Sequence, residues 1–537
     1  MNGFDTALNA ARRAKEWREL KADPRVDLLV IGAGITGAGI ALDAASRGLK
    51  VVLAEKHDLA FGTSRWSSKL AHGGLRYLSK MRVKIAYNSA RERKIIMERT
   101  APHLTRALAQ VTPINSYLSP LQTVAVRCGY LAGDILALAA GTKRSTLPRS
   151  RFAGRKEAEK LLPRVLKKGL KGAWVNYDGQ MIDDARFVVA VARTAAGEGA
   201  KILTYCPVSE ACGSGALLTD KFTGESFYLH AKAVIGAAGV WAGELDPRIK
   251  IRPSRGTHLV FDSRTFGNPA GALTIPLKGS VSRYLFILPA DKNRCYLGLT
   301  DEDQPGEIPD VPPTPEEDIG FLLEGINPAL ERAVGRADIR GMFTGLRPLL
   351  TDGSGSSTAD LSRRHAIVKS GSGMISVVGG KFTEYRLMAQ EALDTAVKSA
   401  NLRAGKCRTR NFPLVGAPGH KENTPDDPKD VCKFPKFLLR RFGLETKRMA
   451  DAAVLPNPLR RIAGLDLVRA EIEYALTHEG AMCVEDILER RTRLSLVPGQ
   501  ARAARKEITE IFNALFPFPG APSAFPSGRN GKREERE

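Results

Sequence analysis

Four residues near the N-terminus have the types and spacing that bind a dinucleotide. Gly32, Gly34 and Gly37 form a G-x-G-x-x-G turn, and Glu55 follows them in the same unit. The first glycine of such a turn permits a tight bend, the second lets the backbone approach a pyrophosphate, and the third lets a helix pack closely. Glu55 is positioned to accept hydrogen bonds from a ribose, and an acid there would repel the 2′-phosphate of NADP. The alternative is a glycine turn that closes an ordinary βαβ unit.

The surrounding sequence supplies the elements that must position this turn. An apolar run over residues 26–31 predicts a buried strand, and a helical pattern covers about 36–47. Residues 50–54 predict a second strand that ends at Glu55. Strand, glycine turn, helix, strand and acid therefore occur in the order of a dinucleotide-binding unit. This order does not separate NAD from FAD.

The segment after the second strand, residues 62–78, is rich in glycine and in hydroxyl side chains. Its runs SSKL (67–70) and HGGLRYL (72–78) resemble the signature of the FAD-dependent, aerobic, quinone-linked glycerol-3-phosphate dehydrogenases. The resemblance continues to about residue 500 and implies that an extended FAD lies along this segment. The FAD contacts that it implies here are Thr63, Ser64, Ser68, Lys69, Gly73 and Gly74.

A further apolar strand is predicted over residues 232–236, and small residues follow it. We expect the backbone at Ala238 and Gly239 to approach the cofactor closely, as in the return strand of flavoproteins with two dinucleotide folds. A plain core strand is the alternative.

A glycine pair, Gly379 and Gly380, joins a predicted strand at 374–378 to a predicted helix. Free N–H groups and the positive end of the helix dipole would stabilise negative charge on a reduced flavin, together with Lys381. The motif resembles the family pattern G-G-K-x-T, which implies that Thr383 also contacts the cofactor. A tight strand-to-helix turn is the alternative.

The substrate hypothesis rests on arginines. A phosphate monoester carries nearly two negative charges, and the planar guanidinium fork suits it. Arg347 and Arg363 match the phosphate-binding arginines of the resembled family. Because Arg364 is adjacent to Arg363, either of the two could be the second arginine.

Oxidation of an alcohol also requires a base for the hydroxyl proton. His258 is the best candidate, because a neutral imidazole suits near-neutral pH. A buried core histidine is the alternative. The resemblance implies that Arg76 and Tyr77 face the substrate and the flavin and that Lys381 touches the substrate, so the identity of the base stays open.

The chain of 537 residues is strongly basic, with a formal charge of +23. Nucleic acid, an anionic membrane surface, a small anionic substrate and a solvated exterior all fit this charge. The basic tracts lack the interleaved aromatic residues of single-strand binders, so no nucleic-acid partner is expected. The seven cysteines include no CxxC pair and predict neither a metal site nor a disulfide framework.

No apolar stretch reads as long enough to cross a membrane. A spanning helix needs about 20 apolar residues, and the longest candidate, 130–140, is interrupted by Asp134. Residues 1–25 favour a helix docked on the main body over an interfacial membrane helix. The basic tract 143–171 could meet anionic headgroups or form an ordinary solvated face.

These observations predict an α/β fold, a flavoprotein with two dinucleotide-binding folds, an antiparallel-sheet substrate domain and an all-α C-terminal domain. The expected segments are an N-terminal helix or leader (1–25), a discontinuous FAD-binding domain (26–400) with the substrate domain inserted mainly at about 80–170 and 250–350, a linker (405–430), a helical domain (431–515) and a disordered tail (516–537).

The resemblance implies that sn-glycerol 3-phosphate is oxidised to dihydroxyacetone phosphate by hydride transfer to FAD, with electrons passed to a membrane quinone. It further implies a cytoplasmic enzyme bound peripherally to the inner face of the cytoplasmic membrane, and it is compatible with a homodimer. The alternatives are an FAD-dependent oxidase of amino acids or other small acids, a glycerol-3-phosphate oxidase that uses oxygen, and a non-catalytic flavin-containing protein that binds nucleic acid or membrane.

Overall fold

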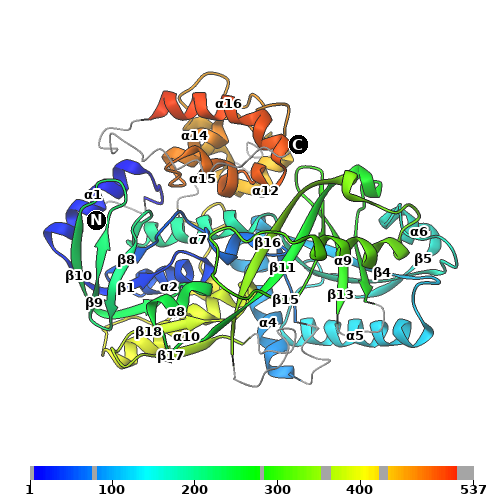
Figure 1. Ribbon diagram of the computed structural model, residues 1–537, viewed down its shortest axis with the longest axis horizontal. Helices are drawn as coiled ribbons and strands as arrows, with labels where there is room; N and C mark the ends of the chain where they lie inside the picture. Colours follow the sequence, from blue (N-terminus) through cyan, green and yellow to red (C-terminus); the bar gives the residue numbers. More distant parts are fainter. Residues whose placement is uncertain (1–4, 75–81, 278–282, 352–363, 422–432, 517–537) are drawn as a thin grey trace.

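The structure is a computed structural model that describes residues 5–74, 82–277, 283–351, 364–421 and 433–516. Two β-sheets lie side by side, and helices from the C-terminal part of the chain pack above them (Figure 1). The predicted combination of a parallel nucleotide-binding sheet, a mainly antiparallel second sheet and a helical C-terminal part is therefore confirmed.

The first sheet contains the dinucleotide-binding unit. Its parallel core has the strand order β18-β10-β1-β2-β7. The strands of this core are apolar on both faces because both faces are covered. Leu28 and Val30 pack against the helices, whereas Leu29 and Ile31 pack towards the N-terminal helix and strand β9. The elements are β1 (Arg25–Ile31), α2 (Ile35–Ser46), β2 (Val51–Ala54), α7 (Asp184–Gly197), β7 (Lys201–Leu203), β8 (Val208–Cys212), β9 (Gly215–Thr219), β10 (Ser226–Gly236), α8 (Ala242–Leu245), β17 (Ala366–Lys369), β18 (Ile375–Val378) and α10 (Tyr385–Ser399).

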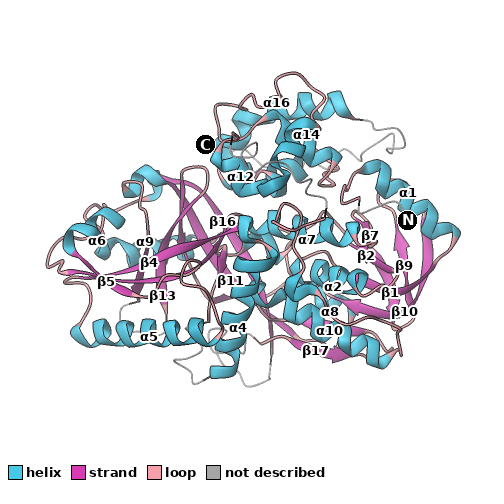
Figure 2. Cartoon of the chain, turned by 180° about the vertical axis from the view of Figure 1, so that it is seen from behind, coloured by secondary structure: helices cyan, strands magenta, loops and turns pink. Residues whose placement is uncertain are grey.

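The second sheet has ten strands and lies beside the first (Figure 2). Its long pair at one edge, β11 and β16, is antiparallel and runs from Ile251 opposite Leu350 to Phe261 opposite Ile339. One pair, β12 with β4, is parallel. The elements are β3 (Leu70–Ala71), α4 (Val83–Ile95), β4 (Thr105–Ile114), α5 (Pro120–Ala139), β5 (Arg151–Gly154), α6 (Arg155–Leu161), β6 (Gly172–Met181), β11 (Ile251–Asp262), β12 (Ala272–Pro276), β13 (Tyr284–Ala290), β14 (Arg294–Gly298), β15 (Glu302–Asp303), α9 (Glu316–Ile326) and β16 (Ile339–Leu350).

The C-terminal helices enclose an apolar core of their own, which includes Leu467, Ile472, Leu488 and Ile508. They lie at the top of Figure 1, above α7. The helices are α12 (Lys436–Phe442), α13 (Thr446–Asp451), α14 (Arg469–Thr477), α15 (Val484–Asp486) and α16 (Pro498–Leu515).

The contact between these helices and the first sheet is ionic and buried. Asp58, just after β2, accepts hydrogen bonds from Arg490 and Arg491 of the C-terminal part. Arg193 of α7 donates to both carboxylate oxygens of Glu445, at 2.6 and 2.9 Å. A buried pair that keeps its hydrogen bonds holds its partners in one register, and loss of one partner leaves a costly buried charge.

We expect the Arg193–Glu445 pair to make the free energy of unfolding depend on pH in the acidic range. Burial alone would raise the pKa of Glu445, but Arg193 and the Tyr474 hydroxyl hold that pKa at about 2 instead of 4.5. Because folding lowers the pKa, the stabilisation is complete above about pH 4.5 and is lost as the pH falls towards 2, with a full value of about 3 kcal/mol. Glu445→Gln should therefore lower the thermal midpoint of unfolding at pH 7, and its difference from the parent should shrink on acidification.

The matched control is Glu157→Gln, which breaks an exposed ion pair with Arg151. Exposed pairs contribute little, so this variant should unfold like the parent. Equal midpoints for the Glu445 variant and the parent at pH 7 would contradict the expectation.

The N-terminal helix α1 (Ala10–Ala22) is docked on the first sheet. Trp17 is buried against Phe227, and Arg13 donates to both carboxylate oxygens of Asp220 at 3.0 Å. The docked arrangement, not the interfacial membrane helix, is the one observed.

The prediction that no segment is long and apolar enough to cross a membrane is wrong. Among the described residues, the 20-residue helix α5 meets that criterion by length and composition, and most of it is not buried. Asp134 does not interrupt it, because its carboxylate accepts hydrogen bonds from the backbone N–H and hydroxyl of Ser150 and so turns away from the apolar face.

Candidate active site

The glycine turn leaves no room for side chains. Gly32 has φ +102°, and a Cβ there would lie 2.7 Å from the carbonyl oxygen of Ala237. A Cβ on Gly37 would lie 1.8 Å from the carbonyl oxygen of Gly32. Gly34 is the N-cap of α2, so the free N–H groups of this helix open onto the turn. The three glycines occupy the positions predicted for them.

The predicted ribose acid and return strand meet at the same turn. Glu55 accepts hydrogen bonds from the N–H groups of Ala33, at 2.6 Å, and His57, at 2.9 Å, and burial raises its pKa. The N–H of Ala237 donates to Ile31, and the Cα of Ala238 lies 3.3 Å from a Cβ built on Gly32. Gly239 follows with φ +58°. The backbones of both strands therefore approach one point at the glycine turn.

Residues 62–74, the described part of the segment that resembles the family signature, are called the signature segment here. This segment is hydrogen-bonded to both the glycine turn and the second sheet. The Ser64 hydroxyl accepts from the N–H of Ile35, the first residue of α2, at 2.9 Å. The Thr63 hydroxyl donates to the carbonyl of Leu346, the residue before Arg347, at 2.7 Å. The segment thus spans from the nucleotide-binding turn to strand β16.

His258 lies beside the signature segment. Its Nε2 is 2.9 Å from the Ser68 hydroxyl, and its ring stacks on Phe343 with centroids 4.6 Å apart. The side chain is fully buried, and Nδ1 has no partner among the described residues. Burial, with the positive charges of Lys69 and Arg347, lowers the pKa of His258 well below 6.5, so the imidazole is neutral at pH 7.

Lys69 is a buried cation held by an acid. It has φ +56°, and its Nζ donates to Asp184, at 3.2 Å, and to the carbonyl of Ser67. Burial lowers the pKa of Lys69. Arg493 of the C-terminal helices lies 3.7 Å from the other oxygen of Asp184. The C-terminal part of the chain therefore reaches the signature segment.

The paired acids at the start of α7 have different roles. Asp183 caps the helix by accepting from the N–H of Arg186. The Asp184 carboxylate instead accepts hydrogen bonds from Ser67 and Lys69.

Lys381 also lies next to the signature segment. Its Nζ donates to Glu384, at 2.7 Å, and to the hydroxyl of Ser89 on α4, at 2.9 Å. A Cβ on Gly74, which has φ +78°, would lie 3.1 Å from Ser89. The N–H of the adjacent Gly73 donates to Asp178 of β6. Neither Ser89 nor Glu384 was predicted; the i, i+3 spacing of Lys381 and Glu384 was the available signal.

The glycine pair after β18 lies beside the predicted phosphate arginine. Gly379 and Gly380 have φ +75° and +84°, values that favour glycine. A Cβ on Gly379 would lie 3.6 Å from the carbonyl oxygen of Pro348 and 2.9 Å from that of Arg364. The end of β16 that carries Arg347 and the glycine turn after β18 are therefore neighbours.

Arg347 is held by several acceptors. Its guanidinium donates to Asp301, at 3.1 Å, to the Ser254 hydroxyl, at 2.9 Å, and to the carbonyl of Thr300, at 3.0 Å. Because these acceptors fix the rotamer of Arg347, its guanidinium is pre-organised to bind an anion. The predicted residues Arg76, Tyr77 and Arg363 lie outside the described residues.

Two parts of the chain match known families. Residues 27–386 match the family described as FAD dependent oxidoreductase, and residues 407–518 match the C-terminal domain of alpha-glycerophosphate oxidase. Glycerol-3-phosphate dehydrogenase 1 of Mycobacterium tuberculosis (strain H37Rv) is 55% identical over 496 residues, which are 92% of this chain and 96% of the relative. This chain belongs to the FAD-dependent glycerol-3-phosphate dehydrogenase family.

Two further relatives are more distant. A mitochondrial glycerol-3-phosphate dehydrogenase of Arabidopsis thaliana is 32% identical over 558 residues, covering 95% of this chain and 86% of the relative. The crystal structure of the glycerol-3-phosphate dehydrogenase from Bacillus halodurans complexed with FAD superposes with a TM-score of 0.69 at 26% identity, over 94% of this chain and 97% of that one.

The residues of this chain fit the FAD of its family. The glycine turn is a cradle that any Cβ would fill, and its helix N-terminus suits a pyrophosphate. Thr383 Oγ1, Trp66 Nε1 and His258 Nδ1 are buried without a partner among the described residues. Buried polar atoms are normally hydrogen-bonded, so these atoms are suited to a bound polar cofactor or substrate.

We expect Thr383→Val to weaken FAD binding. If the Thr383 hydroxyl bonds the cofactor, its loss removes one hydrogen bond of about 1–2 kcal/mol, which is roughly 5- to 30-fold in the dissociation constant. Fluorescence titration of the apoprotein with FAD measures this. Ser376→Ala is the matched control, because the Ser376 hydroxyl is also buried without a partner among the described residues but lies within strand β18. Equal affinities for the Thr383 variant and the parent would contradict the contact.

Proposed function

We propose that this protein oxidises sn-glycerol 3-phosphate to dihydroxyacetone phosphate. The observation that carries the proposal is the convergence around the signature segment. Ser68 bonds the neutral His258, and Thr63 bonds the residue next to Arg347. A histidine able to take a proton and a guanidinium able to hold a phosphate thus flank the segment that resembles the FAD contact of the family.

The chain's residues have separate tasks in this reaction. Arg347, together with Arg363, binds the phosphate and fixes the alcohol end of the substrate. His258 takes the hydroxyl proton at Nδ1, while Nε2–H donates to the Ser68 hydroxyl. When bound, FAD accepts the hydride that leaves the carbinol carbon, and the carbonyl double bond forms as the O–H and C–H bonds break. Lys381 supplies positive charge near the cofactor, and the family resemblance assigns substrate contact to Arg76 and Tyr77.

The test is anaerobic addition of glycerol 3-phosphate to the purified holoenzyme. The yellow flavin absorbance should bleach, and turnover with a soluble artificial acceptor should follow. Bleaching by glycine or another amino acid, with none by glycerol 3-phosphate, would instead support the amino-acid oxidase, in which Arg347 would bind a carboxylate.

We further propose that the electrons pass to a membrane quinone and that the enzyme binds the inner face of the cytoplasmic membrane, in keeping with its charge of +23. Oxygen is the second candidate acceptor, because residues 407–518 match a domain named for an oxidase. Peroxide formed in step with substrate oxidation in air would favour oxygen; reduction of an added quinone without peroxide would favour the quinone.

A further inference from the structure

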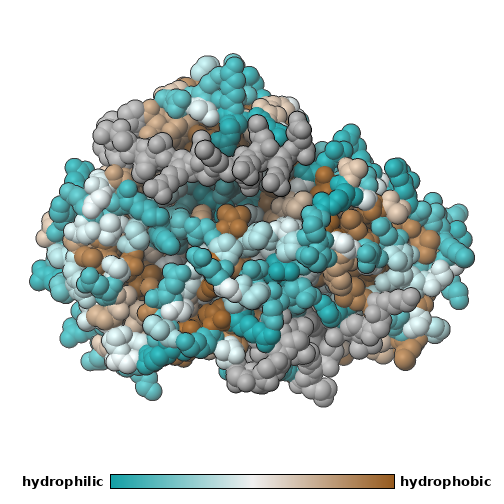
Figure 3. All heavy atoms as spheres, viewed as in Figure 1, coloured by the Kyte–Doolittle hydropathy of each residue, from teal (hydrophilic) through white to brown (hydrophobic). Residues whose placement is uncertain are grey.

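Helix α5 presents an apolar face to solvent along its whole length. Leu121, Ile135 and Leu138 are 78, 66 and 68% exposed, and Val124 and Leu131 are exposed between them. These positions recur at the spacing of one helical face. The helix lies lengthwise along the lower edge of the molecule in Figure 1, and brown apolar surface shows at that edge in Figure 3. Large exposed apolar faces of this kind mark interaction sites.

The two charged residues of α5 point inwards. Arg127 donates to the Ser150 hydroxyl at 3.0 Å and lies over the ring of Trp174. Asp134 accepts from the N–H and the hydroxyl of the same Ser150. The usual arrangement of a surface helix, with charges in water and apolar residues in the core, is therefore reversed over this stretch.

Cations lie beyond the C-terminus of α5 and on α4, the helix that packs against its C-terminal half. Arg82 and Lys84 are exposed at the start of α4, next to exposed Val83, and Lys143 and Arg144 are exposed just after α5. Helices α4 and α5 pack on each other through a cluster that includes Ala86, Ala90, Leu136 and Ala140. Within residues 82–95 and 120–150, all of which the structure describes, no exposed side chain is acidic.

We infer that α5 lies in the plane of an anionic lipid bilayer and inserts its apolar face between the headgroups and the acyl chains. Interfacial helices bind through such a face, and nearby Lys and Arg side chains are attracted to anionic lipids. Pairing of this face with the same face of a second copy would bring like cations together, which is unfavourable. The inference rests on the membrane location in the proposed function and identifies the surface that makes the contact.

The helix lies on the bilayer rather than across it. Its other face is fixed to the protein, because Tyr130 bonds Thr112 of β4 and Leu136 packs against α4. A hollow lined by Gly73, Arg93, Ala137 and Leu138, among others, adjoins both α5 and the signature segment. Membrane contact at α5 would therefore bring a lipid-soluble acceptor to the side of the molecule that carries Gly73.

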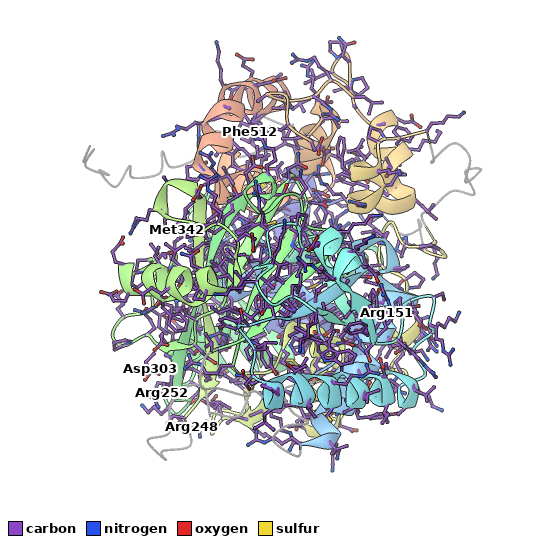
Figure 4. The ribbon with its side chains drawn as sticks, turned by 90° about the vertical axis from the view of Figure 1, so that its right-hand side faces the viewer. Arg151, Arg248, Arg252, Asp303, Met342 and Phe512 are labelled. Carbon is purple, nitrogen blue, oxygen red and sulfur yellow. The ribbon has the colours of Figure 1, made fainter. Side chains whose placement is uncertain are left out.

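The experiment is flotation of the holoenzyme with vesicles of phosphatidylcholine containing phosphatidylglycerol. The test variant is Leu121→Glu/Ile135→Glu, which changes exposed positions outside that hollow. The matched control is Val454→Glu, because Val454 is 76% exposed and lies in the loop after α13. The C-terminal helices lie at the opposite end of the molecule from α5 (Figure 4). We expect the test variant to lose vesicle affinity at least tenfold, and the parent and control to float equally.

Turnover of glycerol 3-phosphate with a soluble acceptor separates this inference from the proposed function, and it should be unchanged in both variants. An active parent that does not float, or a test variant that floats like the parent, would overturn the inference alone. A parent that sediments as a dimer and a test variant that sediments as a monomer would overturn it in favour of a second copy.

Discussion

Replacing His258 with asparagine is expected to lower kcat for glycerol 3-phosphate about 100- to 10,000-fold while FAD stays bound. The imidazole bonds Ser68 through Nε2 and stacks on Phe343, and Nδ1 is left without a partner among the described residues. Asparagine can retain a hydrogen bond to Ser68 but cannot take the alcohol proton. Stopped-flow reduction of the flavin by substrate measures the step directly.

The pH profile gives a second readout for the same residue. Because burial and neighbouring cations lower the pKa of His258, the imidazole stays neutral on moderate acidification. The decline of kcat/KM on the acidic side should therefore have its midpoint below pH 6.5. In the Asn variant this decline should be absent. His230→Asn, an exposed histidine on β10, is the control and should behave like the parent. Reduction at the parental rate in the His258 variant would show that His258 is a core histidine.

Arg347→Ala is expected to lower kcat/KM for glycerol 3-phosphate about 30- to 5,000-fold, mainly through KM. Loss of one partner from a buried, hydrogen-bonded charge pair costs about 2–5 kcal/mol. Arg347→Lys should recover part of the loss, because lysine keeps the charge but not the fork. Steady-state kinetics with glycerol 3-phosphate and, separately, with glycerol measure the effect, and the penalty should vanish for the substrate that lacks the phosphate.

Asp301→Asn separates a phosphate role from a structural one. Asp301 forms an ion pair with Arg347 at 3.1 Å. If Arg347 serves only to hold Asp301 and strand β11, both variants should lower the thermal midpoint and the flavin content alike, with no selective rise in KM. A phosphate role predicts a large rise in KM for the Arg347 variants and a small one for Asp301→Asn.

The local pattern was enough to predict the cofactor half of the site. The glycine spacing, the flanking apolar runs and Glu55 act over a few tens of residues, so their positions follow from chain geometry alone. The prediction about membrane-spanning segments failed because it depended on a contact that is not local in the chain. Whether Asp134 interrupts an apolar helix depends on Ser150, which lies beyond the end of that helix and is brought to it only by folding.

By itself the sequence determined a dinucleotide-binding unit, and the resemblance of its motifs to one family implied FAD and the fold class, because the residues of each motif are close together in the chain. Only the tertiary structure decided which distant side chains meet: Ser68 with His258, Lys69 with Asp184, and Lys381 with Ser89. The tertiary structure also decided that α5 turns its apolar face outwards. Contacts between residues far apart in the chain depend on how the two sheets and the C-terminal helices pack. Local sequence propensity does not predict that packing.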